Sequence, residues 1–348
     1  PPPPPPPPHP PPPPPPPHHH SNPTRRSSDL ILVRRKSRHL QGQNERLQKH
    51  EHARTRNISN FMKERLSPFL LNLQKEIGET ASALGYDAYV VGGFVRDLFL
   101  YRANEDIDIV IEGDGIEFAH EFAEHYDARV RSHRKFGTAV LIFPDGFKVD
   151  VATARMEYYD YPGAPPSVET SSLKLDLYRR DFTINTLAIK LNKRLYGTLI
   201  DYFGGQRDIK EKGLRVLHNL SFVEDPTRVL RAIRFEQRFG FKIGKLTLAL
   251  IKNAVKINCF KELTGRRLFL ELKLILKEPD PIKAIERMDE LDLLKFVFPE
   301  VRLTKVVKVL LEEIRKVIVW YNLLYLEESL EPWKVYWHGL TSSLDRKP

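Results

Sequence analysis

Residues 92–97 read "GGFVRD", and "DIDIVIE" follows at residues 106–112. The run "AYVV" (88–91) ahead of them is strand-like, and "VRDLFLY" after the glycines has helical spacing. The second stretch alternates polar and apolar residues, which is typical of a strand with one buried face. A strand, a glycine turn, a helix and a second strand therefore predict the start of a domain that mixes helices with a sheet.

Two aspartates on the second predicted strand are candidate metal ligands. Asp106 and Asp108 are two residues apart, so both carboxylates leave the same face of the strand. Two like charges on an apolar strand are costly unless a cation joins them. All-oxygen ligation suits Mg²⁺, which completes its shell with water and phosphate oxygens. Asp150 lies in the middle of the strand-like run "FKVDVATA" (147–154) and completes a two-metal cluster if the two strands are neighbours; a solvated strand face is its alternative interpretation.

The glycine turn is a candidate phosphate site. Without a Cβ, Gly92 and Gly93 allow a polyphosphate to lie against backbone N–H groups near a helix start. Arg96 is one turn into that helix and is a candidate ligand of phosphate oxygens, and Asp97 is a candidate for orienting Arg96 or a nearby backbone group. The chain has neither G-x-G-x-x-G nor the P-loop pattern, which argues against a dinucleotide fold and a P-loop.

The positive charge is concentrated near the N-terminus. The formal net charge is +10, and residues 23–65 carry twelve Arg and Lys against four acids, so the rest of the chain is close to neutral. Residues 1–20 are sixteen prolines and four histidines, which predict an extended tail to which we assign no function. The single cysteine, Cys259, excludes an internal disulfide framework and suits a reducing compartment. With no run long enough for a membrane span, we expect a cytoplasmic protein without a membrane partner.

Hydrophobic spacing divides the rest of the chain into a mixed part and a helical part. One helix is expected over 57–85, a hairpin over 138–154, a proline-rich loop over 161–172 and a helix that contains "YRRDFTINTLAIKL" (178–191). Further helices are expected at 225–239, 245–257, 266–277, 280–293 and 304–326. We therefore predict a tail and basic linker (1–56), a head (57–200), a helical neck (201–265) and a helical body (266–348).

One of these helices carries a ridge of arginines. Asp225 followed by Pro226 predicts a helix start, because Asp caps helices and proline suits the first position. At 100° per residue, the arginines of this helix share an arc of about 120°; they are Arg228, Arg231, Arg234 and Arg238. Such a ridge repels itself unless something anionic faces it, so we expect an anionic group there. The alternative is a solvated charged face.

Together these motifs resemble a known family. "VVGGFVRDLFL…DIDIVIEG" resembles the signature of the nucleotidyltransferase superfamily, in the branch of bacterial-type (class II) tRNA nucleotidyltransferases and poly(A) polymerases. Five further stretches agree in order: "RKFGTA" (134–139), "DLYRRDFTINTLA" (176–188), "DYFGGQRDI" (201–209), "EDPTRVLRAIRF" (224–235) and "ELTGRRLFLELKLIL" (262–276). The resemblance covers residues 86 to 300 and implies an α+β fold, with a polymerase beta-like mixed-sheet head followed by an all-helical neck and body.

The resemblance also implies a role for each motif. Asp106, Asp108 and Asp150 would be the catalytic carboxylates that hold two Mg²⁺ ions. Arg180 would meet the triphosphate, with Asp181 and Asn185 near the sugar. Asp225 and Arg228 would pair with the edge of the CTP or ATP base, a carboxylate accepting from the amine and an arginine donating to the ring. The implied nucleotide site is completed by Gly92, Gly93, Arg96, Asp97, Arg231 and Arg234.

The implied reaction is template-independent addition of CMP and/or AMP to the 3′ end of tRNA, by in-line attack of the RNA hydroxyl on the α-phosphorus of CTP or ATP. Complete CCA addition, partial C- or A-addition and poly(A) tailing stay open, although "RKFGTA" and "EYYDYPGAPP" (157–166) are more similar to tRNA-type relatives. A catalytically silent RNA-binding module is the alternative from another class, and two retained repelling carboxylates argue against it. We also expect a fragment, since this family continues beyond "WKVYWHGL" (333–340).

Overall fold

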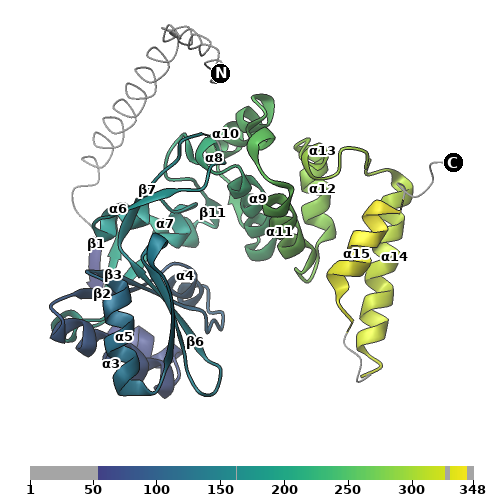
Figure 1. Cartoon of the computed structure of the whole chain (residues 1–348). Helices are drawn as coiled ribbons and strands as arrows, with labels where there is room; N and C mark the ends of the chain where they lie inside the picture. Colours follow the sequence, from purple (N-terminus) through teal and green to yellow (C-terminus); the bar gives the residue numbers. More distant parts are fainter. Residues whose placement is uncertain (1–53, 162, 326–329, 343–348) are drawn as a thin grey trace, which may run out of the picture. The chain divides into compact units, whose positions relative to one another are not determined.

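The computed structural model describes residues 54–161, 163–325 and 330–342 (Figure 1). The chain divides into two units, residues 1–51 and 52–348. The first unit lies outside the described residues, as does almost all of the tail and linker predicted at 1–56. In the described part of the chain, no helix is long and apolar enough to cross a membrane.

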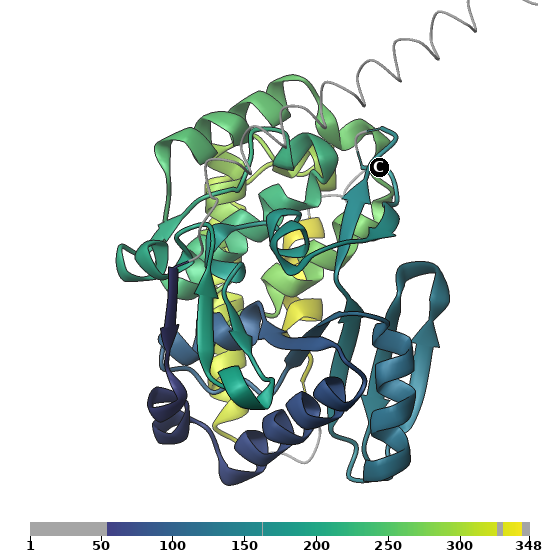
Figure 2. The same cartoon turned by 90° about the vertical axis from the view of Figure 1, so that its left-hand side faces the viewer.

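The head is built on one mixed sheet of eight strands in the order β1-β10-β9-β2-β3-β6-β5-β4. The pair β3–β6 is parallel and the other neighbouring pairs are antiparallel, which confirms the predicted mixed sheet. Strand β1 (Arg54–Asn57) forms one edge of the sheet, so the sheet begins three residues before the boundary expected at residue 57 (purple strand in Figure 2). The other strands are β2 (Asp87–Val91), β3 (Ile107–Glu112), β4 (Arg129–His133), β5 (Thr138–Ile142), β6 (Lys148–Thr153), β9 (Ala188–Lys190) and β10 (Thr198–Asp201).

Helices of the head pack against this sheet. The single helix expected over 57–85 is wrong, because the chain forms α2 (Ser59–Arg65) and α3 (Pro68–Ala83). The break follows from Ser67, whose hydroxyl accepts the N–H of Leu70, and from proline at the first position of α3. Helices α3 and α5 (Gly115–Tyr126) lie side by side (Figure 1). Helix α4 (Gly93–Phe99) follows the glycine turn as predicted.

The segment 178–191 differs from the helix that its sequence suggested. It contains the end of α6 (Leu173–Tyr178), a 3₁₀ turn η2 (Thr183–Asn185) and strand β9. Asp181 accepts its neighbour's N–H and Thr186 donates to the carbonyl of Thr183, so side chains compete with the helix for the backbone. Strand β9 lies between β2 and β10, and a strand that is buried on both faces shows no polar alternation.

The chain after residue 201 is mainly helical, as predicted. The expected helix over 280–293 ends early, because Asp292 has a positive φ of 58° that no helix continues. The helices are α7 (Gly205–Lys210), α8 (Ser221–Glu224), α9 (Thr227–Phe239), α10 (Lys245–Lys256), α11 (Gly265–Leu276), α12 (Ile282–Glu290), α13 (Leu294–Val297), α14 (Lys305–Asn322) and α15 (Pro332–Thr341). Shorter elements are β7 (Arg155–Tyr158), β8 (Ser167–Thr170), β11 (Gly213–Leu214), β12 (Lys242–Ile243), η1 (Arg134–Phe136), η3 (Lys193–Leu195) and η4 (Cys259–Glu262).

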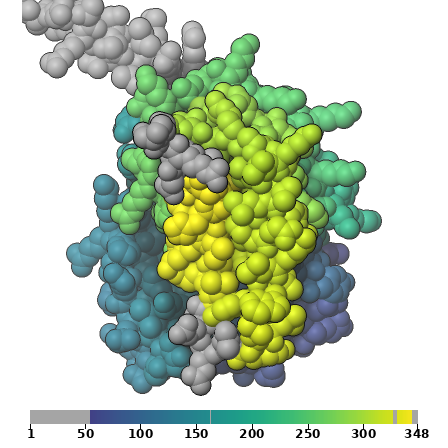
Figure 3. Space-filling view, turned by 90° about the vertical axis from the view of Figure 1, so that its right-hand side faces the viewer, coloured from purple at the N-terminus to yellow at the C-terminus, as the bar shows by residue number. Residues whose placement is uncertain are grey.

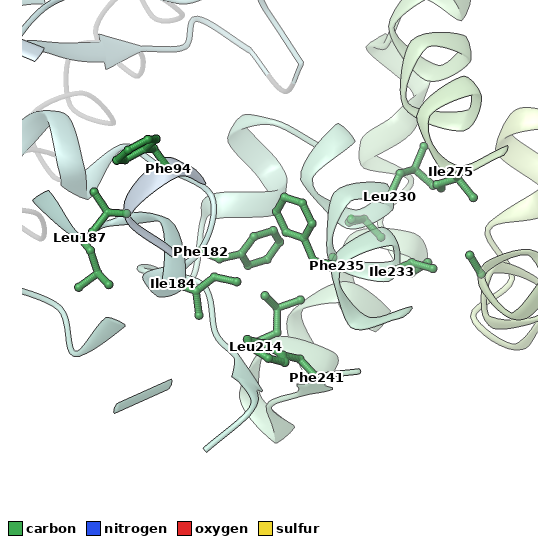
Figure 4. Close-up of a cluster of buried hydrophobic side chains, with 14 of the residues drawn as sticks. Phe94, Phe182, Ile184, Leu187, Leu214, Leu230, Ile233, Phe235, Phe241 and Ile275 are labelled. Carbon is green, nitrogen blue, oxygen red and sulfur yellow. The ribbon is translucent and has the colours of Figure 1, made fainter. Parts of the chain in front are cut away.

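Apolar side chains join the head to the first helices of the helical part. Phe182 lies in the head, and its ring meets Phe235 of α9 edge-on at 5.9 Å between centroids (Figure 4). Leu230 and Ile233 on the same helix are also buried, next to Ile275 of α11. Farther along the chain, α14 and α15 pack against each other and form the yellow-green face in Figure 3. Helix α9 is thus attached to the head by a packed apolar contact.

Candidate active site

A cavity of about 870 Å³ lies between the head sheet and helices α9 and α11. It is lined by most of the residues that the sequence singled out: Gly92, Gly93, Arg96, Asp108, Asp150, Arg180, Asp181, Asn185, Asp225, Arg228 and Arg231. Asp97, Asp106 and Arg234 are not among its lining residues. The fold therefore gathers segments more than a hundred residues apart in the chain around one space.

Two candidate metal ligands stand side by side in this cavity. Strands β3 and β6 are parallel neighbours, and Asp108 is in register with Asp150, which confirms that their strands are adjacent. Asp106 precedes the first residue of β3 and is exposed, so it is not in the strand as expected. Burial raises the pKa of Asp108, and the charges of Asp150 and Asp106 raise it further, while Arg180 opposes them. Burial and the charge of Asp106 likewise raise the pKa of Asp150.

The carboxylates fit a hard divalent cation. Burial and neighbouring carboxylates both disfavour the ionised forms of these groups, and a bound cation would favour them. Among the described residues, no three His, Cys, Asp or Glu side chains are arranged as a ready-made metal cage. Mg²⁺ needs no such cage, because it binds through one or two carboxylates plus water and phosphate oxygens. The carboxylate donors are thus of the kind that Mg²⁺ binds, and a Mg²⁺ ion at this site stays a prediction.

Gly92 brings an arginine close to these carboxylates. Its φ is +73°, and a Cβ there would lie 2.7 Å from Nη1 of Arg180 and 3.5 Å from Oδ2 of Asp108. Asp176 is a fully buried carboxylate. It accepts Nη2–H of Arg180 at 3.2 Å and so helps to hold this arginine in position. Burial alone would raise the pKa of Asp176, but the guanidinium groups of Arg179 and Arg180 hold it below its ordinary value. The turn therefore needs glycine both for its backbone angle and for the space beside Arg180.

The guanidinium of Arg96 is bound by side chains of the protein itself. Its Nε and Nη2 donate to the two oxygens of Asp97, both at 2.9 Å, and its Nη1 donates to Oδ1 of Asn185 at 2.7 Å. The guanidinium also lies 4.5 Å from the ring centroid of Phe239 in α9. Asp97 thus orients Arg96, one of the two roles expected for it. Contact between Arg96 and phosphate stays a prediction.

Asp181 is occupied in a similar way. Its Oδ2 accepts both Nε–H and Nη2–H of Arg231, at 2.8 and 2.6 Å, and its Oδ1 accepts Nδ2–H of Asn185 at 2.8 Å. Burial by itself would raise the pKa of Asp181, but Arg231 and Asn185 hold it at about 2. Asp181 is therefore a fixed anion that ties the head to α9, and its expected contact with the sugar stays a prediction.

The arginine ridge of α9 is faced by carboxylates of the protein itself. Arg231 and Arg234 approach Glu271 of α11 at 3.7 and 3.8 Å. Arg234 and Arg238 approach Glu278 at 3.7 and 3.6 Å. The expectation that something anionic faces the ridge is confirmed, and the packing of α11 beside α9 provides the anions. Arg234 is buried in this contact, away from the cavity.

Asp225 and Arg228 are held at the cavity wall by their own partners. Asp225 Oδ1 accepts the N–H and hydroxyl of Thr227, at 3.1 and 2.6 Å, and Nη2–H of Arg267 at 2.8 Å. Arg228 donates from Nη1 to Ser221 Oγ at 2.8 Å and from Nη2 to the carbonyl of Arg179 at 2.7 Å. Helix α9 begins at Thr227 rather than at Pro226. Both side chains are thus oriented before any ligand binds.

Several cavity residues had no role assigned from the sequence. Arg267 lies in the stretch "ELTGRRLFLELKLIL" (262–276), but nothing in the sequence pairs it with Asp225, 42 positions earlier. Glu157 accepts the hydroxyl of Tyr159 at 2.8 Å and pairs with Arg179 at 2.8 Å. The cavity residues without an assigned role include His133, Thr138, Glu157, Tyr159, Arg179, Thr227, Phe235, Arg267, Leu270 and Glu271.

Comparison with known proteins agrees with this geometry. Residues 88–215 match the family described as "Poly A polymerase head domain", and residues 240–303 match "Probable RNA and SrmB-binding site of polymerase A". The chain is 57% identical over 291 residues to an A-adding tRNA nucleotidyltransferase of Geobacter sulfurreducens, a match that covers 84% of this chain and 33% of that protein. The chain therefore spans about a third of the length of this curated relative.

Solved structures give the same result. A CCA-adding enzyme in its apo form II has a TM-score of 0.76 and 45% identity, covering 82% of this chain and 67% of that one. A tRNA nucleotidyltransferase complexed with a primer tRNA and an incoming ATP analog has a TM-score of 0.70 and 41% identity, covering 77% and 75%. Structures at 44% and 42% identity are CCA-adding enzymes in complex with ATP and with CTP. The chain belongs to the family of the tRNA nucleotidyltransferases and poly(A) polymerases.

Proposed function

We propose that this chain transfers a nucleotide from CTP and/or ATP to the 3′ end of tRNA and releases pyrophosphate. The observation that carries the proposal is the pairing, across one cavity, of in-register Asp108 and Asp150 with the oriented pair Asp225 and Arg228. The first pair suits phosphoryl chemistry at a triphosphate, and the second suits the hydrogen-bonding edge of a base.

In the proposed reaction, the 3′-hydroxyl of the RNA attacks the α-phosphorus in line. An oxygen–phosphorus bond forms there as the bond to the β-phosphate bridge breaks, and pyrophosphate leaves. Magnesium ions held by Asp106, Asp108 and Asp150 would supply charge neutralisation at the phosphates and a lowered pKa for the attacking hydroxyl. Arg180, kept in place by Asp176, would hold phosphate oxygens beside the turn of Gly92 and Gly93.

Base choice would come from Asp225 and Arg228. Since Arg267 and Thr227 occupy Oδ1 of Asp225, the carboxylate presents a fixed acceptor to the exocyclic amine shared by cytosine and adenine. Arg228 would donate to the ring nitrogen or carbonyl beside it. UTP and GTP lack this donor and acceptor order and would be rejected. The remaining residues of the proposed nucleotide site would hold these groups in position; they are Arg96, Asp97, Asp181, Asn185, Arg231 and Arg234.

The relatives favour tRNA as the RNA substrate and AMP as an added nucleotide. The Geobacter sulfurreducens relative is named an A-adding enzyme, whereas solved relatives are named CCA-adding enzymes. We therefore propose A-addition for this chain, with C-addition as the second arm of the test. We further propose that residues 57–200 are the catalytic head, that 201–265 and 266–348 are neck and body, and that the protein works in the cytoplasm, where a single cysteine stays reduced.

The test is nucleotide addition by the purified chain and its Asp108→Ala variant. With Mg²⁺ and single labelled nucleotides, wild type should extend tRNA ending in CC with AMP, and the variant should give no product. RNA binding and thermal unfolding of the variant should stay close to wild type. Incorporation by Asp108→Ala above background would overturn the assignment.

Product identity needs tRNAs that end before, within and after CCA. Extension of only the CC-ended tRNA by one AMP supports A-addition, and ordered CMP and AMP addition supports a complete CCA activity. Long A-runs on arbitrary RNA would indicate poly(A) tailing. Binding without any incorporation would indicate an RNA-binding module.

A further inference from the structure

A second hollow lies on the head, at the other end of helix α4 from the candidate active site. Two cavities of about 750 and 420 Å³ share Arg56, Phe99 and Tyr101 as lining residues. The active-site cavity is lined instead by Gly93 and Arg96 at the start of α4. We name the second hollow the edge groove, which is lined by Arg54, Arg56, Phe99, Tyr101, Arg207 and Lys210.

The edge groove is rich in positive charge. Arg54, Arg56 and Lys210 are exposed, and within the described part of the chain none of them has an ion-pair partner. Arg207 is also exposed, and its Nε approaches Asp208 at 3.2 Å, but that carboxylate is shared with a second arginine. The acid that lines the groove, Asp201, is buried and accepts three backbone N–H groups of residues 204–206. The groove therefore presents net positive charge to a ligand.

The two strand arginines are spaced like a phosphate-binding pair. Arg54 and Arg56 are two residues apart on β1, so they share one face of the strand and lie about 6.7 Å apart along it. This separation is comparable to that between successive phosphates of an extended single strand. Strand β1 is the edge of the sheet, and among the described residues it is paired with β10 on one side.

An aromatic ring stands beside these arginines. Tyr101 is 66% exposed. Its backbone has a φ of 58°, which non-glycine residues seldom adopt. Phe61 meets its ring edge-on at 6.2 Å, and the guanidinium of Arg65 lies 3.6 Å from its centroid. Phe61 is itself stacked on Phe99 at 5.5 Å. The ring is thus fixed in position at the surface, which is the property of a platform on which a base stacks.

We propose that the edge groove is a second RNA-binding site, which holds a single-stranded segment with phosphates on Arg54 and Arg56 and a base against Tyr101. The site is distinct from the active-site cavity and from residues 240–303, which match the RNA-binding family. Arg54, Arg56 and Arg65 are the described arginines of the basic stretch at residues 23–65. An acidic protein segment would use the arginines but would make no use of the exposed part of the Tyr101 ring, so the observations favour RNA.

The first test measures binding of a labelled single-stranded RNA of about 14 nucleotides, blocked by a 3′-phosphate so that no nucleotide can be added. The variant is Arg54→Glu/Arg56→Glu. Its matched control is Arg129→Glu/Arg131→Glu on β4, the opposite edge of the same sheet, where two exposed arginines have the same spacing. We expect binding about tenfold weaker for the first variant and a salt-dependence slope reduced by about 1.4, or 0.7 per phosphate contact, with the control close to wild type.

The second test is Tyr101→Asn, which removes the ring but keeps a residue that tolerates positive φ. We expect weaker RNA binding with an unchanged salt slope, and loss of the fluorescence quenching that a 2-aminopurine base shows when it stacks. Addition of AMP to saturating CC-ended tRNA should be unchanged in both groove variants, which separates this proposal from the proposed function. Wild-type binding and slope in Arg54→Glu/Arg56→Glu, or an equal loss in the β4 control, would overturn it. Displacement of the RNA by poly-glutamate of equal charge would assign the groove to acidic protein instead.

Discussion

Asp108 and Asp150 are candidate metal ligands whose ionised forms are disfavoured in the folded chain. Burial raises the pKa of each, and neighbouring carboxylates add to this. A raised pKa means that the ionised form is less favourable in the folded chain than in the unfolded chain. The ligand-free protein therefore holds its candidate metal ligands at a cost, which a cation at the same place would remove.

This cost predicts a pH-dependent effect of Asp108→Asn. Because the folded pKa is raised, the stability linked to protonation is present below the unfolded value near 3.9 and is lost as pH rises through the folded pKa. The variant does not ionise, so at pH 7 it should unfold at a higher temperature than wild type in the presence of EDTA. The difference should disappear at pH 3 to 4 in thermal unfolding followed by circular dichroism. A variant that is less stable than wild type at pH 7 would contradict this explanation.

Gly92 predicts a second effect at the residue scale. Gly92→Ala places a methyl group 2.7 Å from Nη1 of Arg180 and strains a positive φ, so Arg180 must move. We expect AMP addition to fall at least tenfold, chiefly through weaker ATP binding. Gly146→Ala is the matched control, because Gly146 has a φ of +87° with nothing within 4 Å of the added Cβ. Equal loss of activity in both variants would show that backbone strain, and not the position of Arg180, is responsible.

At the scale of elements, carboxylates of the head and of α11 hold helix α9 in position. Asp181 of the head binds Arg231, and Glu271 of α11 faces Arg231 and Arg234. A second link runs from α11 through Arg267 to Asp225, just ahead of α9, and to the carbonyl of Gly163. Helix α11 therefore orients the carboxylate that we propose for base selection, although it lies in a different segment of the chain.

Arg267→Gln should accordingly reduce base selectivity more strongly than it reduces the free energy of unfolding. Without the guanidinium, Asp225 keeps its hydrogen bonds to Thr227. It loses the hydrogen bond from Arg267 that helps to fix the orientation of its carboxylate. We expect the preference for ATP over GTP to fall about tenfold, which corresponds to one lost charged hydrogen bond. The measurement is the ratio of kcat/KM values for the two nucleotides. Arg266→Gln, a change at the exposed neighbouring residue, should leave the ratio unchanged.

At the scale of the whole molecule, the head and the helical part share one hydrophobic core. Phe182 and Phe235 make this contact edge-on, and both are buried. The guanidinium of Arg96 also lies 5.4 Å from the ring centroid of Phe235. The walls of the cavity therefore belong to one packed unit, so a change in the apolar contact should reach the site.

Phe235→Ala should test that connection. Removing a buried ring costs about 3 kcal/mol of unfolding free energy, and here it also removes the ring beside the guanidinium groups of Arg96 and Arg231. We expect a lower urea midpoint together with a higher KM for ATP. Phe69→Ala is the control, because Phe69 is 51% exposed and should change neither value strongly. Loss of stability with an unchanged KM would show that the contact does not position the site.

The sequence alone was sufficient for the features that depend on local chemistry. The glycine turn, the strand that carries Asp108, the start of the helix near Asp225 and the helical second half all follow from capping, alternation and periodicity, whereas Asp106 lies just outside that strand. The motifs also indicated the family before any contact was known. Local rules failed where the reason for a structure lay elsewhere in the chain, as in segment 178–191, whose strand exists because β2 and β10 flank it.

Only the tertiary structure decided which charges face one another. The register of β3 with β6 placed Asp150 beside Asp108, and the packing of α11 against α9 gave the arginine ridge carboxylate partners from the protein instead of from a ligand. The same packing brought Arg267 to Asp225 and closed the cavity around Gly92. Hydrophobic periodicity predicts which face of an element is buried but not what it is buried against, because that choice is made by residues far away in the chain.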